Sequence, residues 1–123
     1  MRPLSIRRIG SIAILRPGGP LVGDQVAEEL QNRIQELQNE GNRYLIVNLE
    51  AVEFINSACL GVLVAVCAEY RRRGASVGVC HPTKKVRAQK DSGCSCWRSM
   101  QWYDSEDEAI ASMTAARGDS APG

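Results

Sequence analysis

The feature that most constrains the fold is a short, continuous apolar run, Tyr44-Leu45-Ile46-Val47, which lies between two helix-like segments. A strand that is apolar at every position, rather than at alternate positions, is typical of a parallel sheet covered on both faces. Neighbouring parallel strands need long crossover connections, which are usually helices. The run therefore predicts a layered α/β domain.

The segments on either side fit this interpretation. Isoleucines on both sides of Gly10-Ser11 predict two short strands joined by a tight turn. Asp24 is expected to cap a helix with a buried stripe, and Gly41 is expected as its C′ residue. The stripe consists of Val26, Leu30, Ile34 and Leu37. The later predicted elements are a helix from Ser57 to before Gly74, a strand from Ala75 to Cys80, a short basic helix from Pro82 to Lys90, a strand from Ser99 to Tyr103, and a helix opened by the capping box of Ser105 and Glu108.

This order predicts a small mixed, mostly parallel five-stranded sheet with about four helices, in which the first strand is the antiparallel edge. Residues 1–114 are expected to form a single domain and residues 115–123 a flexible C-terminal tail. The predicted core contains Leu45, Ile46, Val47, Leu60, Leu63, Val64, Val77 and Val79.

Composition and charge exclude several classes of function. The 123 residues carry a net charge of +1, so no overall field favours nucleic acid or a membrane surface. No apolar run approaches the roughly 18 residues of a membrane span. The N-terminus shows no secretory pattern, and we expect a cytoplasmic protein.

The sequence offers little support for catalysis, a metal or a cofactor. Five cysteines without a secretory pattern do not predict a disulfide framework. Three of them lie in apolar segments (Cys59, Cys67 and Cys80), and the other two form the close pair Cys94 and Cys96. His81 is the single histidine, and the chain contains no phosphate-binding loop and no nucleophile elbow. We therefore expect a protein that is not an enzyme, with no cofactor and no metal.

One segment stands out, because Val52 to Leu63 joins a buried strand to the start of a helix through small polar residues. From these residues alone, ordinary capping by Asn56 or Ser57 is the simpler interpretation. The alternative is a ligand or partner site, because such sites gather beyond the carboxyl ends of strands in open α/β sheets. A serine at a helix start also lies where a phosphate is stabilised.

The segment resembles the signature of the STAS domain, a family that includes anti-sigma factor antagonists and the cytoplasmic tails of sulfate transporters. That signature is an aspartate, a serine, a small residue, glycine, leucine and glycine at the start of the second helix. Here it is matched by Asn56, Ser57, Ala58, Leu60 and Gly61, with Cys59 in place of the first glycine. Gly19-Pro20-Leu21 and the segment from Tyr103 to Ala109 are similar to two further parts of the family pattern.

The resemblance implies an anti-sigma factor antagonist that binds an anti-sigma factor serine kinase, is phosphorylated on Ser57 and is reset by a serine phosphatase. It is expected to be a monomer or a weak dimer. The partner-binding residues would be Gly19, Leu21, Asp24, Asn56, Ser57, Ala58, Cys59 and Gly61. Two alternatives stay open, namely a STAS subunit that docks on a membrane transporter without phosphorylation, and a thiol-dependent enzyme.

Overall fold

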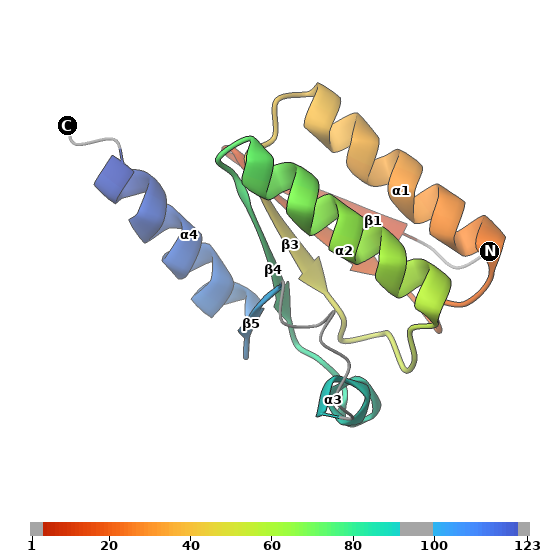
Figure 1. The fold of residues 1–123 in the computed structure, drawn as a ribbon. Helices are drawn as coiled ribbons and strands as arrows, with labels where there is room; N and C mark the ends of the chain where they lie inside the picture. The colour runs from red at the N-terminus through yellow and green to blue at the C-terminus, as the bar shows by residue number, and fades with distance from the viewer. Residues whose placement is uncertain (1–3, 92–99, 121–123) are drawn as a thin grey trace.

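The structure is a computed structural model that describes residues 4–91 and 100–120 as one α/β domain (Figure 1). Its elements follow the order β1 (Leu4–Ile9), β2 (Ile12–Pro17), α1 (Asp24–Asn39), β3 (Tyr44–Asn48), α2 (Ser57–Arg72), β4 (Ser76–Cys80), α3 (Lys84–Asp91), β5 (Gln101–Tyr103) and α4 (Glu106–Ser120). The predicted order of strands and helices is confirmed throughout this part of the chain.

The five strands form one sheet in the order β1-β2-β3-β4-β5. β1 pairs with β2 in the antiparallel sense, whereas β2, β3, β4 and β5 are all parallel to one another. The predicted mixed sheet with an antiparallel first strand at its edge is therefore confirmed. All four parallel strands end at the same edge of the sheet, which we call the carboxyl end.

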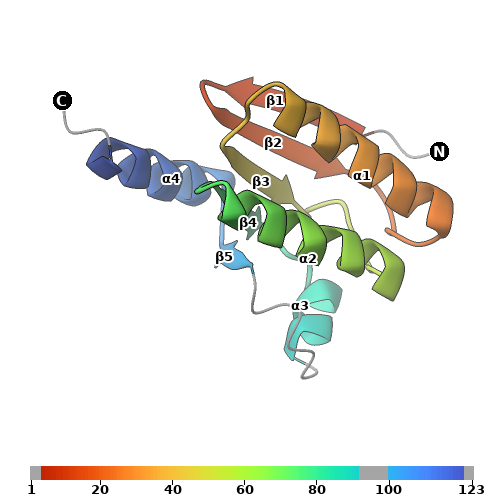
Figure 2. The ribbon, with the colours of Figure 1, turned by 45° about the horizontal axis from the view of Figure 1, so that its top comes forward.

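Helices cover both faces of the sheet, as the apolar run predicts. α1 and α2 lie side by side on one face, and α4 packs on the other face against β3, β4 and β5 (Figures 1 and 2). The run on β3 alternates between the two layers: Leu45 and Val47 belong to the core under α1 and α2, whereas Tyr44 and Ile46 belong to the core under α4. Both sets are buried, which explains why β3 is apolar at every position.

Two glycines end the long helices. Gly41 follows α1 with a φ of 85°, and Gly74 follows α2 with a φ of 74°. After α1, the Gly41 amide donates to Gln38 and the Asn42 amide to Leu37, a pairing that satisfies two of the last free carbonyls of the helix. The prediction of Gly41 as the C′ residue is therefore confirmed. Glycine suits this position because a residue with a side chain adopts the left-handed conformation only at a cost in energy.

The start of α1 differs from the prediction. Gly23, with a φ of 98°, occupies the N-cap position, and no side-chain hydrogen bond caps the helix. Asp24 is instead the first helical residue, and the prediction of Asp24 as the cap is wrong. At this position its carboxylate still lies near the positive end of the helix dipole, which is a favourable location.

Further differences concern lengths and burial. α3 begins at Lys84 rather than Pro82, and Thr83 caps it by accepting a bond from the Val86 amide at 3.3 Å. α4 continues to Ser120, so the helix extends beyond residue 114, where the sequence predicts a tail. Leu60, Val64 and Val26 of the predicted stripe on α1 are only half-buried at the margin of the core, whereas the other predicted core residues are buried. Within residues 4–91 and 100–120, none of the helices combines the length and apolar character that a membrane crossing requires.

Candidate functional site

Two loops that are far apart in sequence pair with each other at the carboxyl end of the sheet. Leu21 and Ile55 form an isolated parallel bridge. The Leu21 amide donates to the Phe54 carbonyl at 2.8 Å, and the Asn56 amide donates to the Leu21 carbonyl at 2.9 Å. The loop between β2 and α1 is thereby fixed beside the segment that leads into α2, and the two form one continuous surface.

Ser57 is the first residue of α2, and its side chain is exposed. The preceding Asn56 is the N-cap, and its Oδ1 accepts a hydrogen bond from the Cys59 amide at 3.0 Å. Capping is therefore carried out by Asn56, and the Ser57 hydroxyl does not provide it. The first turn of α2 contains no acidic residue of its own, and the carboxylate whose charge reaches it, at Cys59, is that of Asp24 in α1.

The predicted partner-binding residues are brought together, but not all of them are accessible. Asp24, Ser57 and Gly61 are exposed. Half-buried positions are Gly19, Asn56 and Ala58. Leu21 and Cys59 are buried, with 3% and 0% of their surface exposed, so their side chains support the surface from inside.

Two exposed apolar side chains beside Ser57 were missed in the sequence. Val22 is 39% exposed and Phe54 is 46% exposed, and each directly adjoins a residue of the Leu21–Ile55 bridge. Because the bridge pairs the two loops, the backbones of Val22 and Phe54 lie near the segment that begins α2. Exposed large apolar residues that gather at one place are typical of protein–protein contacts. The signal available in the sequence was the single phenylalanine of the chain, which stands in a loop between Glu53 and the strand-like Ile55.

A buried carboxylate lies on the opposite face of the sheet, at the start of α4. Glu106 is only 8% exposed, and its Oε2 accepts hydrogen bonds from Arg16 at 2.7 Å and from Asn48 at 2.6 Å. Arg7 lies 3.7 Å from the other carboxylate oxygen. The bond from Arg16 is the main reason that the pKa of Glu106 lies below its usual range, although burial acts in the opposite direction. The cluster attaches α4 to β1, β2 and β3 and needs no ligand.

The three described cysteines, Cys59, Cys67 and Cys80, are free and buried. Burial raises the pKa of Cys59, and the negative charge of Asp24 raises it further. Burial also raises the pKa of Cys67 to about 11 and that of Cys80 to about 12. A reactive cysteine requires the opposite shift. These environments therefore do not favour the thiol-enzyme alternative at Cys59, and Cys94 and Cys96 lie outside the described residues.

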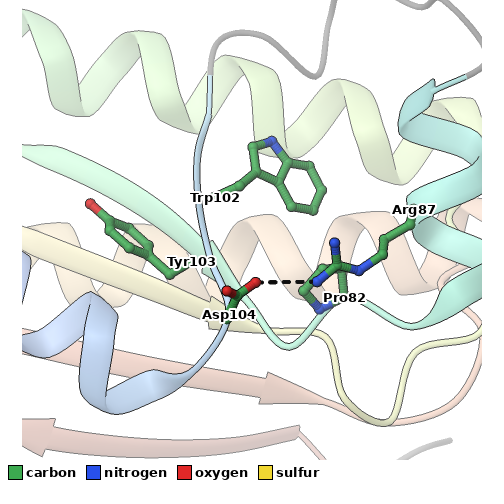
Figure 3. Close-up of a pocket in the computed structure, with 5 residues that line it drawn as sticks. All are labelled: Pro82, Arg87, Trp102, Tyr103 and Asp104. Atoms are coloured by element: carbon green, nitrogen blue, oxygen red, sulfur yellow. Dashed lines mark hydrogen bonds and ion pairs between the residues drawn. The ribbon is translucent and has the colours of Figure 1, made fainter.

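A hollow of about 140 Å³ opens on the side of the molecule where α3 faces β5 (Figure 3). Pro82, Arg87, Trp102, Tyr103 and Asp104 line it. Its two charged side chains already pair with each other, because Arg87 donates to Asp104 at 3.3 Å. None of the predicted site residues contributes to this hollow. In the part of the chain that the structure describes, no group of three or more acidic, histidine or cysteine side chains is placed to hold a metal ion.

Comparison with known proteins places this architecture in context. The family model of the STAS domain matches residues 3–109. The chain is similar to a candidate anti-sigma factor antagonist from Thermotoga maritima, with a TM-score of 0.80 and 23% identity over 90% of this chain and 94% of that one. It is also similar to the phosphorylated form of the Bacillus cell fate determinant SpoIIAA, with a TM-score of 0.67 and 20% identity over 89% of this chain and 97% of that one.

A transporter shows the same architecture. The murine anion transporter Slc26a9 aligns with a TM-score of 0.73 and 16% identity, over 89% of this chain but only 18% of the transporter. At these identities the likenesses show a shared fold. A five-stranded mixed sheet with four helices, and a helix start presented at its carboxyl end, define a small α/β domain of the type found in all three proteins. Together with the match to residues 3–109, this shows that the chain belongs to the STAS domain family.

Proposed function

We propose that this protein is an anti-sigma factor antagonist, a cytoplasmic protein-binding switch that is not itself an enzyme. The observation that carries the proposal is the exposed Ser57 at the first residue of α2, on a segment that carries the exposed Phe54 and is paired with the loop that carries the exposed Val22. The partner would be an anti-sigma factor serine kinase, which binds the unphosphorylated surface and phosphorylates Ser57. A serine phosphatase would reverse the modification.

The charges around Ser57 support release of the partner by local repulsion. A phosphate adds about −1.5 to −2 charges at neutral pH. The nearest arginines of the same helix, Arg71 and Arg72, lie in its last turn, roughly 20 Å away at 1.5 Å per residue. They cannot neutralise a phosphate on Ser57 from within the helix. A partner packed on this surface would have to desolvate that phosphate, at a cost of several kcal/mol unless a cation meets it.

The test is phosphorylation by a purified anti-sigma factor serine kinase of the same organism, followed by mass spectrometry and by affinity measurement. The unmodified protein should bind and gain one phosphate, and Ser57→Ala should bind but gain none. Ser105→Ala is the matched control, because Ser105 also stands at a helix start and accepts a bond from the Glu108 amide at 3.1 Å. Equal phosphorylation of Ser57→Ala and the unmodified protein would contradict the proposal.

The binding surface can be mapped with the same kinase. Asp24→Lys reverses an exposed charge at the start of α1, and Phe54→Ala removes an exposed apolar contact. Both should weaken binding, whereas Arg72→Ala at the far end of α2 should not. If the kinase instead protects residues 71–90 from labelling and leaves residues 19–24 and 54–61 open, the surface is wrongly assigned.

A second candidate, a subunit that docks on a membrane transporter without phosphorylation, is favoured by the likeness to part of Slc26a9. The two candidate functions predict different partners for the purified protein, a kinase or a permease. They also predict different effects of ATP on the binding of that partner. Binding to a purified permease that persists in ATP, with no phosphate on Ser57, would support the second candidate and contradict the first.

A further inference from the structure

A single side chain forms hydrogen bonds with both backbone groups of Ile55. The Ile55 amide donates to Oε1 of Gln89 at 3.1 Å, and Nε2 of Gln89 donates to the Ile55 carbonyl at 2.8 Å. The donor and the acceptor of the Gln89 side-chain amide thus pair with Ile55 in the way that the backbone of a neighbouring strand would. The two residues are 34 positions apart, and Gln89 belongs to α3.

The other edge of the same segment is occupied by Leu21. It accepts from the Asn56 amide and donates to the Phe54 carbonyl, so residues 54–56 are hydrogen-bonded on both sides. The segment is therefore held like a central strand, with the loop before α1 on one side and the Gln89 amide on the other. Asn56 and Ser57 follow directly and begin α2.

Gln89 is itself held in place, because α3 is attached at three further points. Val86 is fully buried, the Thr83 hydroxyl donates to the Val52 carbonyl at 2.9 Å, and Arg87 pairs with Asp104 at 3.3 Å. In Figure 1, α3 lies at the same end of the sheet as the loop that leads from β3 into α2. The helix and this loop thus form one hydrogen-bonded unit.

We propose that Gln89 is a positioning residue of the Ser57 site, which holds residues 54–56 in the conformation that presents Phe54 and Ser57 to the partner. It acts through Ile55 and does not belong to the exposed surface made by Ser57, Val22 and Phe54. That Gln89 fixes residues 54–56 does not depend on the proposed function. That this affects binding of the partner rests on the proposed function.

The first experiment is amide hydrogen exchange by NMR on Gln89→Met, which keeps the length of the side chain and removes both hydrogen bonds. Lys85→Met is the matched control, since Lys85 is an exposed residue of the same helix and its replacement leaves Ile55 paired. The Ile55 amide should exchange about thirtyfold faster in Gln89→Met, the change expected when two ordinary hydrogen bonds are lost. The decisive amides are those of Asn56 and Cys59, which bond to Leu21 and to the Asn56 side chain.

If Gln89 positions the segment, the Asn56 and Cys59 amides also exchange faster, while amides of the central strand β3 keep their rates. Faster exchange at Ile55 alone would show a local bond without a positioning role and would overturn the inference. Should Gln89→Met fail to fold, Gln89→Glu replaces it, because a carboxylate keeps the acceptor for the Ile55 amide and loses the donor to its carbonyl.

The second experiment separates this inference from the proposed function. The kinase assay on Gln89→Met should show a raised KM with kcat within about twofold, since a displaced segment weakens binding before it affects phosphate transfer. Unchanged KM together with faster exchange at Asn56 and Cys59 would overturn the link to the partner. Absence of phosphorylation in the unmodified protein would contradict the proposed function, and the exchange result would still decide the role of Gln89.

Discussion

The Oδ1 atom of Asn56 accepts a hydrogen bond from the backbone amide of Cys59 at 3.0 Å, so the residue before the candidate phosphorylation site is the cap of its helix. Because Asn56 caps the helix, the Ser57 side chain is exposed and takes no part in capping. A change at Ser57 should therefore affect the partner, and a change at Asn56 should affect the helix.

Removal of the cap gives the first prediction. Asn56→Ala should lower the free energy of unfolding by about 0.5–2 kcal/mol, the usual loss when an N-cap side chain is removed. Asn56→Asp should keep the stability, because a carboxylate caps equally well and lies favourably at the positive end of the helix. Urea unfolding followed by circular dichroism measures both. A smaller loss for Asn56→Ala than for Asn56→Asp would contradict the role of this side chain.

The second prediction concerns the charge that phosphorylation would bring. Ser57→Asp should keep the circular dichroism spectrum and change the free energy of unfolding by about 0.5 kcal/mol or less, because the residue is exposed and its helix start has no acidic residue in the first turn. Its affinity for the kinase should fall. A variant that unfolds, or one that binds as tightly as the unmodified protein, would show that Ser57 is not the switch.

Two glycines provide a matched pair for the third prediction. A Cβ on Gly78 would lie 2.7 Å from the Tyr103 ring and 3.1 Å from the Met113 methyl, whereas a Cβ on Gly61 would have nothing within 4 Å. Gly78→Ala should cost about 1–3 kcal/mol through overpacking of β4 against Tyr103 of β5 and Met113 of α4. Gly61→Ala should stabilise by about 0.5–1 kcal/mol, because alanine is the better helix former. Thermal unfolding of the two variants should therefore shift in opposite directions.

The fourth prediction tests the pKa of Glu106. Because the folded protein holds this pKa below its unfolded value, the carboxylate contributes stability above about pH 4.5, and that contribution is lost as the pH falls through the folded pKa. Glu106→Gln should be less stable at pH 7, because the neutral amide still accepts from Arg16 but the ion pair with Arg16 is lost. Its stability should also fall less between pH 5 and pH 3, as measured by urea midpoints. Parallel curves for the two proteins would contradict the assignment.

Thiol reactivity supplies the fifth prediction. In a Cys94→Ser, Cys96→Ser variant, the remaining thiols should react with a disulfide reagent at pH 8 only after denaturation, because all three are buried and their pKa values are raised. Rapid reaction of one thiol in the folded variant would restore the thiol-enzyme alternative.

The sequence predicts the layers of this fold because the information is local. Apolar periodicity, the continuous run on β3 and the glycines after α1 and α2 are all readable within a few residues. The start of α1 is harder, because both a glycine and an aspartate are acceptable caps, and only the φ of 98° at Gly23 decides between them.

The candidate site divides in the same way. The motif around Ser57 is contiguous and could be found, whereas the contribution of Gln89 depends on a pairing across 34 positions. The burial of Glu106 likewise depends on distant residues, because Arg16 of β2 and Asn48 of β3 both donate to this carboxylate at the start of α4. Side-chain to backbone pairings between distant elements leave no periodic pattern, and for that reason they escaped prediction.

The residues of α2 divide into a buried face and an exposed face, and this division affects how the binding surface of such a protein can change in evolution. Cys59, Leu63, Val66, Cys67 and Tyr70 fill the core, while Ser57, Gly61, Ala65 and Ala68 point outward on the same helix. Substitutions at the outward positions change the surface with little effect on folding, because they touch no core contact. Duplicated copies of this gene can therefore acquire separate partners one surface residue at a time, and each step leaves a folded protein on which selection can act.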